Sequence, residues 1–94
     1  MNINIEGLNI NYITEGSGPC VLLLHGWGAN IDTMMPIFNI LKNDFKVYAL
    51  DFPGFGKSEE PREAFGVHDY ARVTKSFIDA FGMKEVILIG HSFG

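Results

Sequence analysis

The chain has 94 residues, of which 47% are apolar, and seven Lys and Arg against eleven Asp and Glu give it a net charge of −4. This composition is typical of one small globular domain and excludes a largely disordered chain. No basic stripe could neutralise a phosphate backbone, and the longest apolar run, Cys20 to Leu24, is too short to cross a bilayer. We therefore expect no nucleic-acid partner and no membrane span. Because the N-terminus lacks the pattern of a secretory signal, we expect a cytoplasmic protein.

The first elements expected along the chain are two strands that form a hairpin. Apolar and polar residues alternate over Asn2 to Ile5 and Leu8 to Ile13, and Gly7 suits the turn between them. The run CVLLLH after Pro19 is apolar at consecutive positions, as in a strand buried on both faces. Cys20 is the only cysteine, so it cannot form an internal disulfide, and we expect it to be a buried apolar side chain.

Two helices are expected after this strand. The first has Asp32 or Thr33 as its N-cap, Pro36 in its first turn and Asn43 at its end. The second helix ends at Gly82. The apolar positions at helical spacing are Met34, Ile37, Phe38 and Leu41 in the first, and Tyr70, Val73, Phe77, Ile78 and Phe81 in the second.

The runs KVYAL before Asp51 and EVILI before Gly90 predict two further buried strands. Strands that alternate with helices predict an α/β fold: a mostly parallel sheet with right-handed crossovers, helices packed on its faces and the antiparallel hairpin at one edge. The stretch from Phe52 to Phe65 is rich in Gly, Pro and charge and predicts a long loop. The sequence shows no linker or repeat, so we assign residues 1–94 to one domain.

Three loops leave the carboxyl ends of the predicted strands, where open α/β sheets bind their ligands. Their sequences are HGWGAN, DFPGFGKS and GHSFG. In the last, Gly90, Ser92 and Gly94 form the Gly-x-Ser-x-Gly pattern of a nucleophile elbow, a strained turn that exposes a serine hydroxyl. A side chain at either glycine would collide with the adjoining strand and helix. Ser92 is therefore the candidate catalytic nucleophile.

The loop HGWG is the candidate for half of an oxyanion hole. Acyl transfer to a serine needs two main-chain N–H donors, typically from the residue after the serine and from the loop after the third strand. Those residues are Phe93 and Trp27. Gly26 and Gly28 leave space for a substrate to approach this backbone. The alternative is that HGWG is only a turn between strand and helix, with the Trp27 side chain serving in packing rather than in an acyl pocket.

The combination of LLLHGWG, LDFPGFGKSEEP and LIGHSFG resembles the N-terminal portion of the α/β-hydrolase superfamily. The similarity is to its esterase-like branch, which includes haloperoxidase-type and meta-cleavage-product hydrolases, and it spans essentially the whole chain. The resemblance implies that Ser92 is the nucleophile, that the amides of Trp27 and Phe93 form the oxyanion hole, and that the substrate is a small carboxylic ester or related acyl compound. Epoxide hydrolases and haloalkane dehalogenases share the scaffold but carry aspartate at the nucleophile position, so Ser92 argues against both.

The other two triad members that the resemblance implies follow the serine in the order acid, then histidine, and neither is present here. No local histidine is a convincing base. His91 should leave the elbow in another direction, His25 corresponds to a position that holds the loop in the family, and His68 is expected on the surface. Asp51 is expected to anchor the DFPGFG turn through hydrogen bonds to its own backbone. We expect no metal, because these residues lack metal-ligand spacing, and no cofactor.

We therefore expect the chain to be the N-terminal portion of one α/β-hydrolase domain, cut after the elbow and without the C-terminal half of the fold. We expect little or no turnover from it alone. The alternative is a non-catalytic fragment, or half of a split protein that needs a complementary chain. In both cases Val86 to Ile89 would present an unpaired apolar edge, which favours self-association or binding of a complementary chain.

An alternative from another class of protein is nucleotide binding. Gly56, Lys57 and Ser58 match the end of a phosphate-binding P-loop. The full pattern needs glycine five residues before the Gly-Lys pair, and that position holds Asp51, whose charge would repel phosphate. The sequence therefore disfavours a phosphate site.

Overall fold

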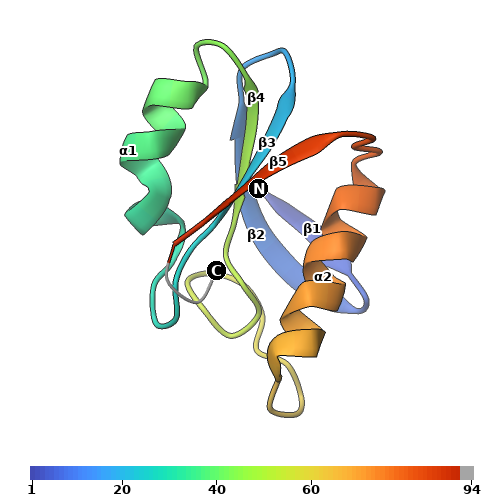
Figure 1. Ribbon diagram of the computed structural model, residues 1–94. Coiled ribbons are helices and arrows are strands. Elements are labelled where there is room, and N and C mark those ends of the chain that lie inside the picture. The colour runs from blue at the N-terminus through green and yellow to red at the C-terminus, as the bar shows by residue number, and fades with distance from the viewer. Residues whose placement is uncertain (92–94) are drawn as a thin grey trace.

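The computed structural model describes residues 1–91, which form one five-stranded sheet with a helix on either side (Figure 1). The elements are β1 Asn2–Ile5, β2 Leu8–Glu15, β3 Cys20–Leu24, α1 Ile31–Leu41, β4 Lys46–Leu50, α2 Val67–Ala80 and β5 Val86–Gly90. The strand order is β1-β2-β4-β3-β5. β2 runs antiparallel to β1 and β4, whereas β3 runs parallel to β4 and β5. The predicted α/β architecture, with the hairpin at one edge, is confirmed.

The two helices cover opposite faces of the central strands. Successive side chains of a strand point to opposite faces, so β3 and β4, apolar at consecutive positions, contribute to two separate cores. The core under α1 contains Val21, Leu23, Val47, Ala49, Met34 and Phe38, and the core under α2 contains Leu22, Leu24, Tyr48, Leu50, Val73 and Phe77. Phe38 and Phe77 are fully buried, and each such burial stabilises the fold by roughly 1.5–3 kcal/mol.

Helix α1 begins earlier than predicted. Its N-cap is Asn30, which has an extended backbone and whose side-chain oxygen accepts a hydrogen bond from the Asp32 N–H at 2.9 Å. Pro36 is therefore inside the helix rather than in its first turn. Pro36 and Asp32 both lie on the exposed face, where the carbonyl that proline leaves without a donor can contact water. At the other end, the Asn43 side chain donates to a carbonyl of the last turn at 3.3 Å, close to the predicted end.

Helix α2 ends as predicted, with Gly82 at a φ of +66° directly after the C-cap. Strand β5 differs from the prediction of a buried strand, because Ile87 and Leu88 are 50% and 52% exposed. Among the described residues β5 pairs only with β3, and the space between Leu88 and α2 is open. Cys20, expected to be buried, is only half-buried at the first position of β3.

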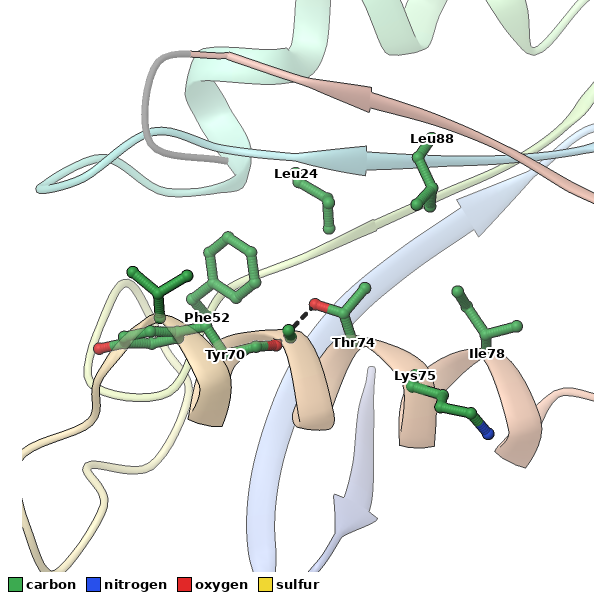
Figure 2. Close-up of a pocket in the computed structure, with 9 residues that line it drawn as sticks. Leu24, Phe52, Tyr70, Thr74, Lys75, Ile78 and Leu88 are labelled. Carbon is green, nitrogen blue, oxygen red and sulfur yellow. Dashed lines mark hydrogen bonds between the residues drawn. The ribbon is translucent and has the colours of Figure 1, made fainter.

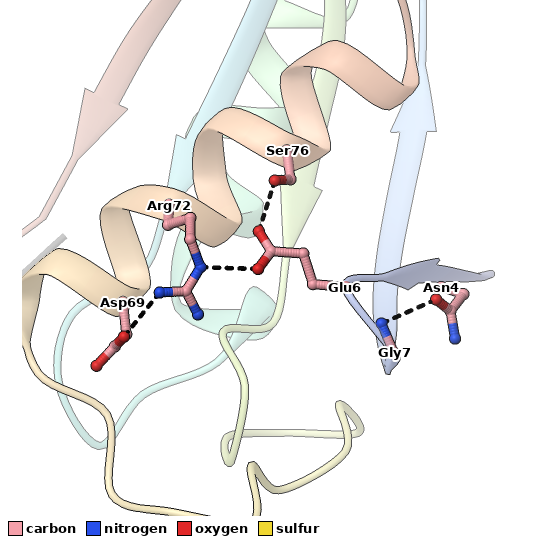
Figure 3. Close-up of polar contacts among 6 residues, drawn as sticks. All are labelled: Asn4, Glu6, Gly7, Asp69, Arg72 and Ser76. Atoms are coloured by element: carbon pink, nitrogen blue, oxygen red, sulfur yellow. Dashed lines mark hydrogen bonds and ion pairs between the residues drawn. The ribbon is translucent and has the colours of Figure 1, made fainter.

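The β1–β2 turn is tied to α2 by a group of polar contacts (Figure 3). The Glu6 carboxylate accepts hydrogen bonds from Arg72 Nε and Ser76 Oγ, each at 2.7 Å, and Arg72 also pairs with Asp69 at 2.8 Å. The Ser76 hydroxyl, and then Arg72, hold the pKa of Glu6 below its usual range. The Gly66 N–H, and then Arg72, do the same for the pKa of Asp69. These contacts fix the position of α2 against the hairpin.

Candidate active site

The carboxyl ends of β3, β4 and β5 lie at one edge of the sheet. Parallel pairing places Leu24 opposite both Leu50 and Gly90. One residue further, the His91 N–H donates to the Leu24 carbonyl oxygen at 3.1 Å. The last described residue therefore lies beside the start of the loop that contains Trp27, as expected for loops that leave a common edge.

Three of the predicted site residues, Ser92, Phe93 and Gly94, lie outside the described residues. The nucleophile, the second oxyanion donor and the elbow therefore stay predictions. The same holds for the expected collision of a side chain at Gly90, because it depends on the bend that follows. His91, the last described residue, is exposed.

The loop between β3 and α1 is a tight turn. The Ala29 N–H donates to the Gly26 carbonyl oxygen at 3.1 Å, so that Trp27 and Gly28 are the two central residues of the turn. Gly28 has a φ of +75°, which strains any other residue, and a Cβ there would meet no described atom within 4 Å. Glycine is thus required by the turn itself, and the backbone beside Trp27 is open on that side. Gly26 is buried at the base of the turn.

His25 links this loop to the end of β4. Its ring is fully buried, and Nε2 accepts a hydrogen bond from the Phe52 N–H at 2.9 Å. Because Nε2 is an acceptor, the ring proton is on Nδ1, which donates to the Gly26 carbonyl oxygen at 2.8 Å. Both ring nitrogens are occupied by main-chain groups. His25 therefore has a structural role and no ring nitrogen left to accept a proton from a substrate or from the serine, in agreement with the expectation that it is not the base.

Asp51 makes the converse link, from β4 to the loop after β3. Its side chain is 2% exposed, and Oδ1 accepts a hydrogen bond from the N–H of Ile31, the first residue of α1, at 2.8 Å. Oδ2 accepts from Asn11 Nδ2 at 2.9 Å and from the Lys57 N–H at 3.0 Å. The prediction that Asp51 anchors the DFPGFG loop through the loop's own backbone is met in part, by the Lys57 N–H, but the other two partners belong to β2 and α1. We call the contacts His25–Phe52 and Asp51–Ile31 the strand-end brace.

The Trp27 side chain lies on an aromatic cluster rather than in open solvent or in the core. Its ring packs edge-on against Phe55, with centroids 5.1 Å apart, and against Tyr70 at 6.3 Å, yet 63% of the residue is exposed. A hollow of about 320 Å³ borders these three side chains and the loop that contains Pro61 and Phe65. The Trp27 side chain therefore packs on neighbouring rings, as the packing alternative expects, while it also borders the hollow.

A second, more apolar cavity of about 340 Å³ separates α2 from the end of β3 and from β5 (Figure 2). Leu24 and Leu88 approach it from the sheet, Phe52 lies at its β4 end, and α2 contributes Tyr70 and Ile78. The Thr74 hydroxyl adds no polar contact across the cavity, because it donates a hydrogen bond to the Tyr70 carbonyl oxygen of the same helix at 2.8 Å. The cavity is therefore an apolar surface that β5 and α2 leave uncovered.

The geometry gives no support to nucleotide binding at Gly56 to Ser58. The Lys57 N–H points at the Asp51 carboxylate, and the Ser58 hydroxyl donates to the Asp51 carbonyl oxygen. A Cβ at Gly56 would overlap the same carboxylate. The groups that would bind a phosphate thus already form hydrogen bonds with Asp51.

Residues 1–91 contain no group of three or more His, Cys, Asp or Glu side chains arranged to hold a metal ion. Within the same range, neither helix has the length and apolar character needed to cross a membrane. His68 is exposed near the start of α2, as predicted from the sequence.

A family model described as alpha/beta hydrolase fold matches residues 19–94. The chain belongs to this family, as the three strand-end motifs indicated. The fold agrees with this assignment, because a solved epoxide hydrolase structure, 32% identical, covers 100% of this chain with a TM-score of 0.95.

Similar proteins include the 2-(acetamidomethylene)succinate hydrolase of Mesorhizobium japonicum, with 32% identity over 98% of this chain and 33% of the relative. The soluble epoxide hydrolase of a Corynebacterium species is 33% identical over 96% of this chain and 32% of its own length. Among solved structures, that of a membrane phospholipase A has 34% identity and a TM-score of 0.95, covering 100% of this chain and 31% of that protein. The chain thus spans about a quarter to a third of the length of the relatives it matches.

Proposed function

We propose that this chain carries the nucleophile and the oxyanion hole of a serine hydrolase that acts on a small carboxylic ester or a related acyl compound. The observation that supports this most is the hydrogen bond from the His91 N–H to the Leu24 carbonyl oxygen. Because Ser92 follows directly in the sequence, this contact favours a nucleophile beside the turn that contains Trp27. The strand-end brace gives that turn a fixed position.

In the proposed reaction, Ser92 Oγ attacks the acyl carbon of the ester while a histidine from outside residues 1–94 accepts the hydroxyl proton. The oxygen that becomes negative accepts hydrogen bonds from the main-chain N–H groups of Trp27 and Phe93. The histidine then gives its proton to the departing alcohol, which leaves an acyl-enzyme. A water molecule, activated by the same histidine, hydrolyses the acyl-enzyme and restores the serine.

The similar proteins do not share one reaction, since their names include epoxide hydrolase and haloalkane dehalogenase as well as phospholipase A. The residue at the nucleophile position separates these reactions. The resemblance implies aspartate there in epoxide hydrolases and dehalogenases, whereas this chain has Ser92. Serine favours acyl transfer, and the phospholipase name fits this choice.

A second candidate function is that of a non-catalytic fragment, or of one half of a split protein. It is favoured by β5, whose outer edge is unpaired among the described residues and whose Ile87 and Leu88 are half exposed. An apolar strand edge beside an apolar cavity is a surface on which a complementary chain can add.

The test is hydrolysis of p-nitrophenyl acetate and butyrate by the protein that carries residues 1–94 together with the remaining triad members. We expect Ser92→Ala to abolish turnover, and a p-nitrophenyl ester to leave an acyl group on the peptide that contains Ser92, detected by mass spectrometry. Ser17→Ala is the matched control, because Ser17 is an exposed turn serine that precedes β3. Full activity of Ser92→Ala would overturn the proposal.

The 94-residue chain alone separates the two candidates further. We expect no turnover from it, and Ser92-dependent turnover only when a complementary chain supplies an acid and a histidine. Ester hydrolysis by the isolated chain, lost in Ser92→Ala, would contradict the second candidate.

A further inference from the structure

The strand-end brace is reciprocal. β3 and β4 pair in register, so His25 and Asp51 are the first residues beyond the same edge of the sheet. The His25 ring accepts the N–H of Phe52, which follows β4, and the Asp51 carboxylate accepts the N–H of Ile31, which follows the loop after β3. Each loop is therefore held by a side chain from the neighbouring strand.

The loop that contains Trp27 is consequently fixed at both ends. At its start, the Gly26 carbonyl oxygen accepts hydrogen bonds from the His25 ring and from the Ala29 N–H. At its end, the Ile31 N–H is bound by Asp51, and a carboxylate at a helix N-terminus also interacts favourably with the helix dipole. Only four residues lie between Gly26 and Ile31, so a shift of the α1 N-terminus must move the Trp27 backbone.

Asp51 is itself held from other directions. Its second oxygen accepts from Asn11 of β2 and from the Lys57 N–H, and the Asp51 N–H donates to the Asn11 carbonyl oxygen at 2.9 Å. The carboxylate therefore transmits the position of two sheet strands to the first residue of α1.

We propose that Asp51 is a positioning residue for the reaction: through its contact with the Ile31 N–H it sets where the main-chain N–H of Trp27 meets the substrate oxygen. This inference rests on the proposed function. Asp51 touches no reacting atom, and without a base next to it, it has no part in proton transfer. Oxyanion donors act only when they are held at the correct position before the reaction.

Replacing Asp51 by alanine removes all of its side-chain contacts and endangers the fold, so the test removes one contact. Ile31→Pro deletes the N–H that Asp51 binds and places the proline ring against the carboxylate, while the backbone suits proline because this is the first helical position after an extended residue. Ile31→Ala is the matched control, because it shortens the same buried side chain but keeps the N–H. Both variants are made in the protein that contains the complete triad.

For p-nitrophenyl butyrate hydrolysis per folded molecule, we expect Ile31→Pro to lower kcat roughly 10- to 100-fold with KM within about twofold, since a misplaced donor weakens transition-state binding only. Ile31→Ala should keep kcat within about twofold of the parent protein, because its N–H remains. Equal kcat values for the two variants would overturn the inference.

If Ile31→Pro does not fold, Asp51→Asn replaces it. Asp51→Asn leaves one side-chain oxygen for donors that now bind two carboxylate oxygens. Asn11→Ala removes only the donor from Asn11 to Oδ2 and leaves the carboxylate intact. Asp51→Asn must then lower kcat more than Asn11→Ala does, and equal kcat values for these two variants would overturn the inference.

A measurement independent of catalysis separates this inference from the proposed function. The NMR order parameter of the Trp27 N–H should fall from about 0.85 to below about 0.6 in Ile31→Pro and stay high in Ile31→Ala. If the parent protein shows no Ser92-dependent hydrolysis, the proposed function fails, and this result alone decides whether Asp51 positions the loop. Equal order parameters in the two variants would show that it does not.

Discussion

Replacing His25 by phenylalanine removes two hydrogen bonds of the ring but leaves only the Phe52 N–H without a partner, because the Gly26 carbonyl oxygen still accepts from the Ala29 N–H. The fully buried His25 ring packs edge-on against Phe52 and Phe55, with centroid distances of 5.0 and 5.6 Å. Phenylalanine keeps an aromatic ring in this place but offers no acceptor to the Phe52 N–H. A buried donor left without a partner costs about 1–3 kcal/mol, so we expect His25→Phe to lower the free energy of unfolding by that amount.

His25→Ala is the companion variant, because it removes the acceptor and the ring together. Truncating a buried aromatic ring to alanine costs about 3–5 kcal/mol through lost burial and the cavity that remains. The difference between the two variants therefore measures the packing of the ring, and His25→Phe measures the combined loss of its two hydrogen bonds.

The assay is urea unfolding followed by the fluorescence of Trp27, the single tryptophan, whose ring lies 5.1 Å from Phe55 beside the substituted site. A domain with a total stability of about 5–15 kcal/mol remains folded after the loss expected for His25→Phe. A free energy of unfolding within about 0.5 kcal/mol of the parent protein would refute the reasoning, because exposed substitutions without structural effect fall in that range.

Two further predictions concern the surface. The Ser76 hydroxyl, and then Arg72, lower the pKa of Glu6 in the folded protein, so these contacts stabilise the fold at neutral pH and are lost as the pH falls through the folded pKa. Glu6→Gln should therefore flatten the acid limb of the urea midpoint against pH between about 7 and 3, and an unchanged slope would contradict this. At the edge of β5, we expect the 94-residue chain to self-associate in sedimentation, and Ile87→Lys with Leu88→Lys to shift it towards monomer. Ile40→Lys is the control, because Ile40 is 70% exposed on α1, and an equal effect of this variant would count against association through the β5 edge.

The sheet and its order of elements could be predicted because the signals are local. Consecutive apolar residues in β3 and β4 require cover on both faces, and helical spacing in α1 and α2 supplies it. Gly82 ends α2 for a reason contained in its own backbone. The partial exposure of β5 could not be predicted from EVILI. An apolar run indicates that a strand can be buried, but it does not show which elements lie next to that strand.

The start of α1 and the Asp51 partners outside its own loop, Ile31 and Asn11, were missed for one shared reason. Asn30, Asp32 and Thr33 are all good N-caps, and the choice is made by a contact from Asp51, twenty positions away along the chain. One partner of its other oxygen, Asn11, is forty positions away. An acid directly after a strand and before a glycine-rich loop is a visible signal for an anchor, but the sequence pattern does not identify the atoms that it holds.

The strand-end brace has a consequence for protein engineering. A loop taken from a related enzyme to alter specificity is usually transplanted as one contiguous segment. Here the segment from Gly26 to Asn30 and the segment from Phe52 to Lys57 are fastened by each other's strands, so a graft of either one alone discards half of its attachments. Chimaeras that exchange both segments together with His25 and Asp51 should fold and function more often than single-loop exchanges.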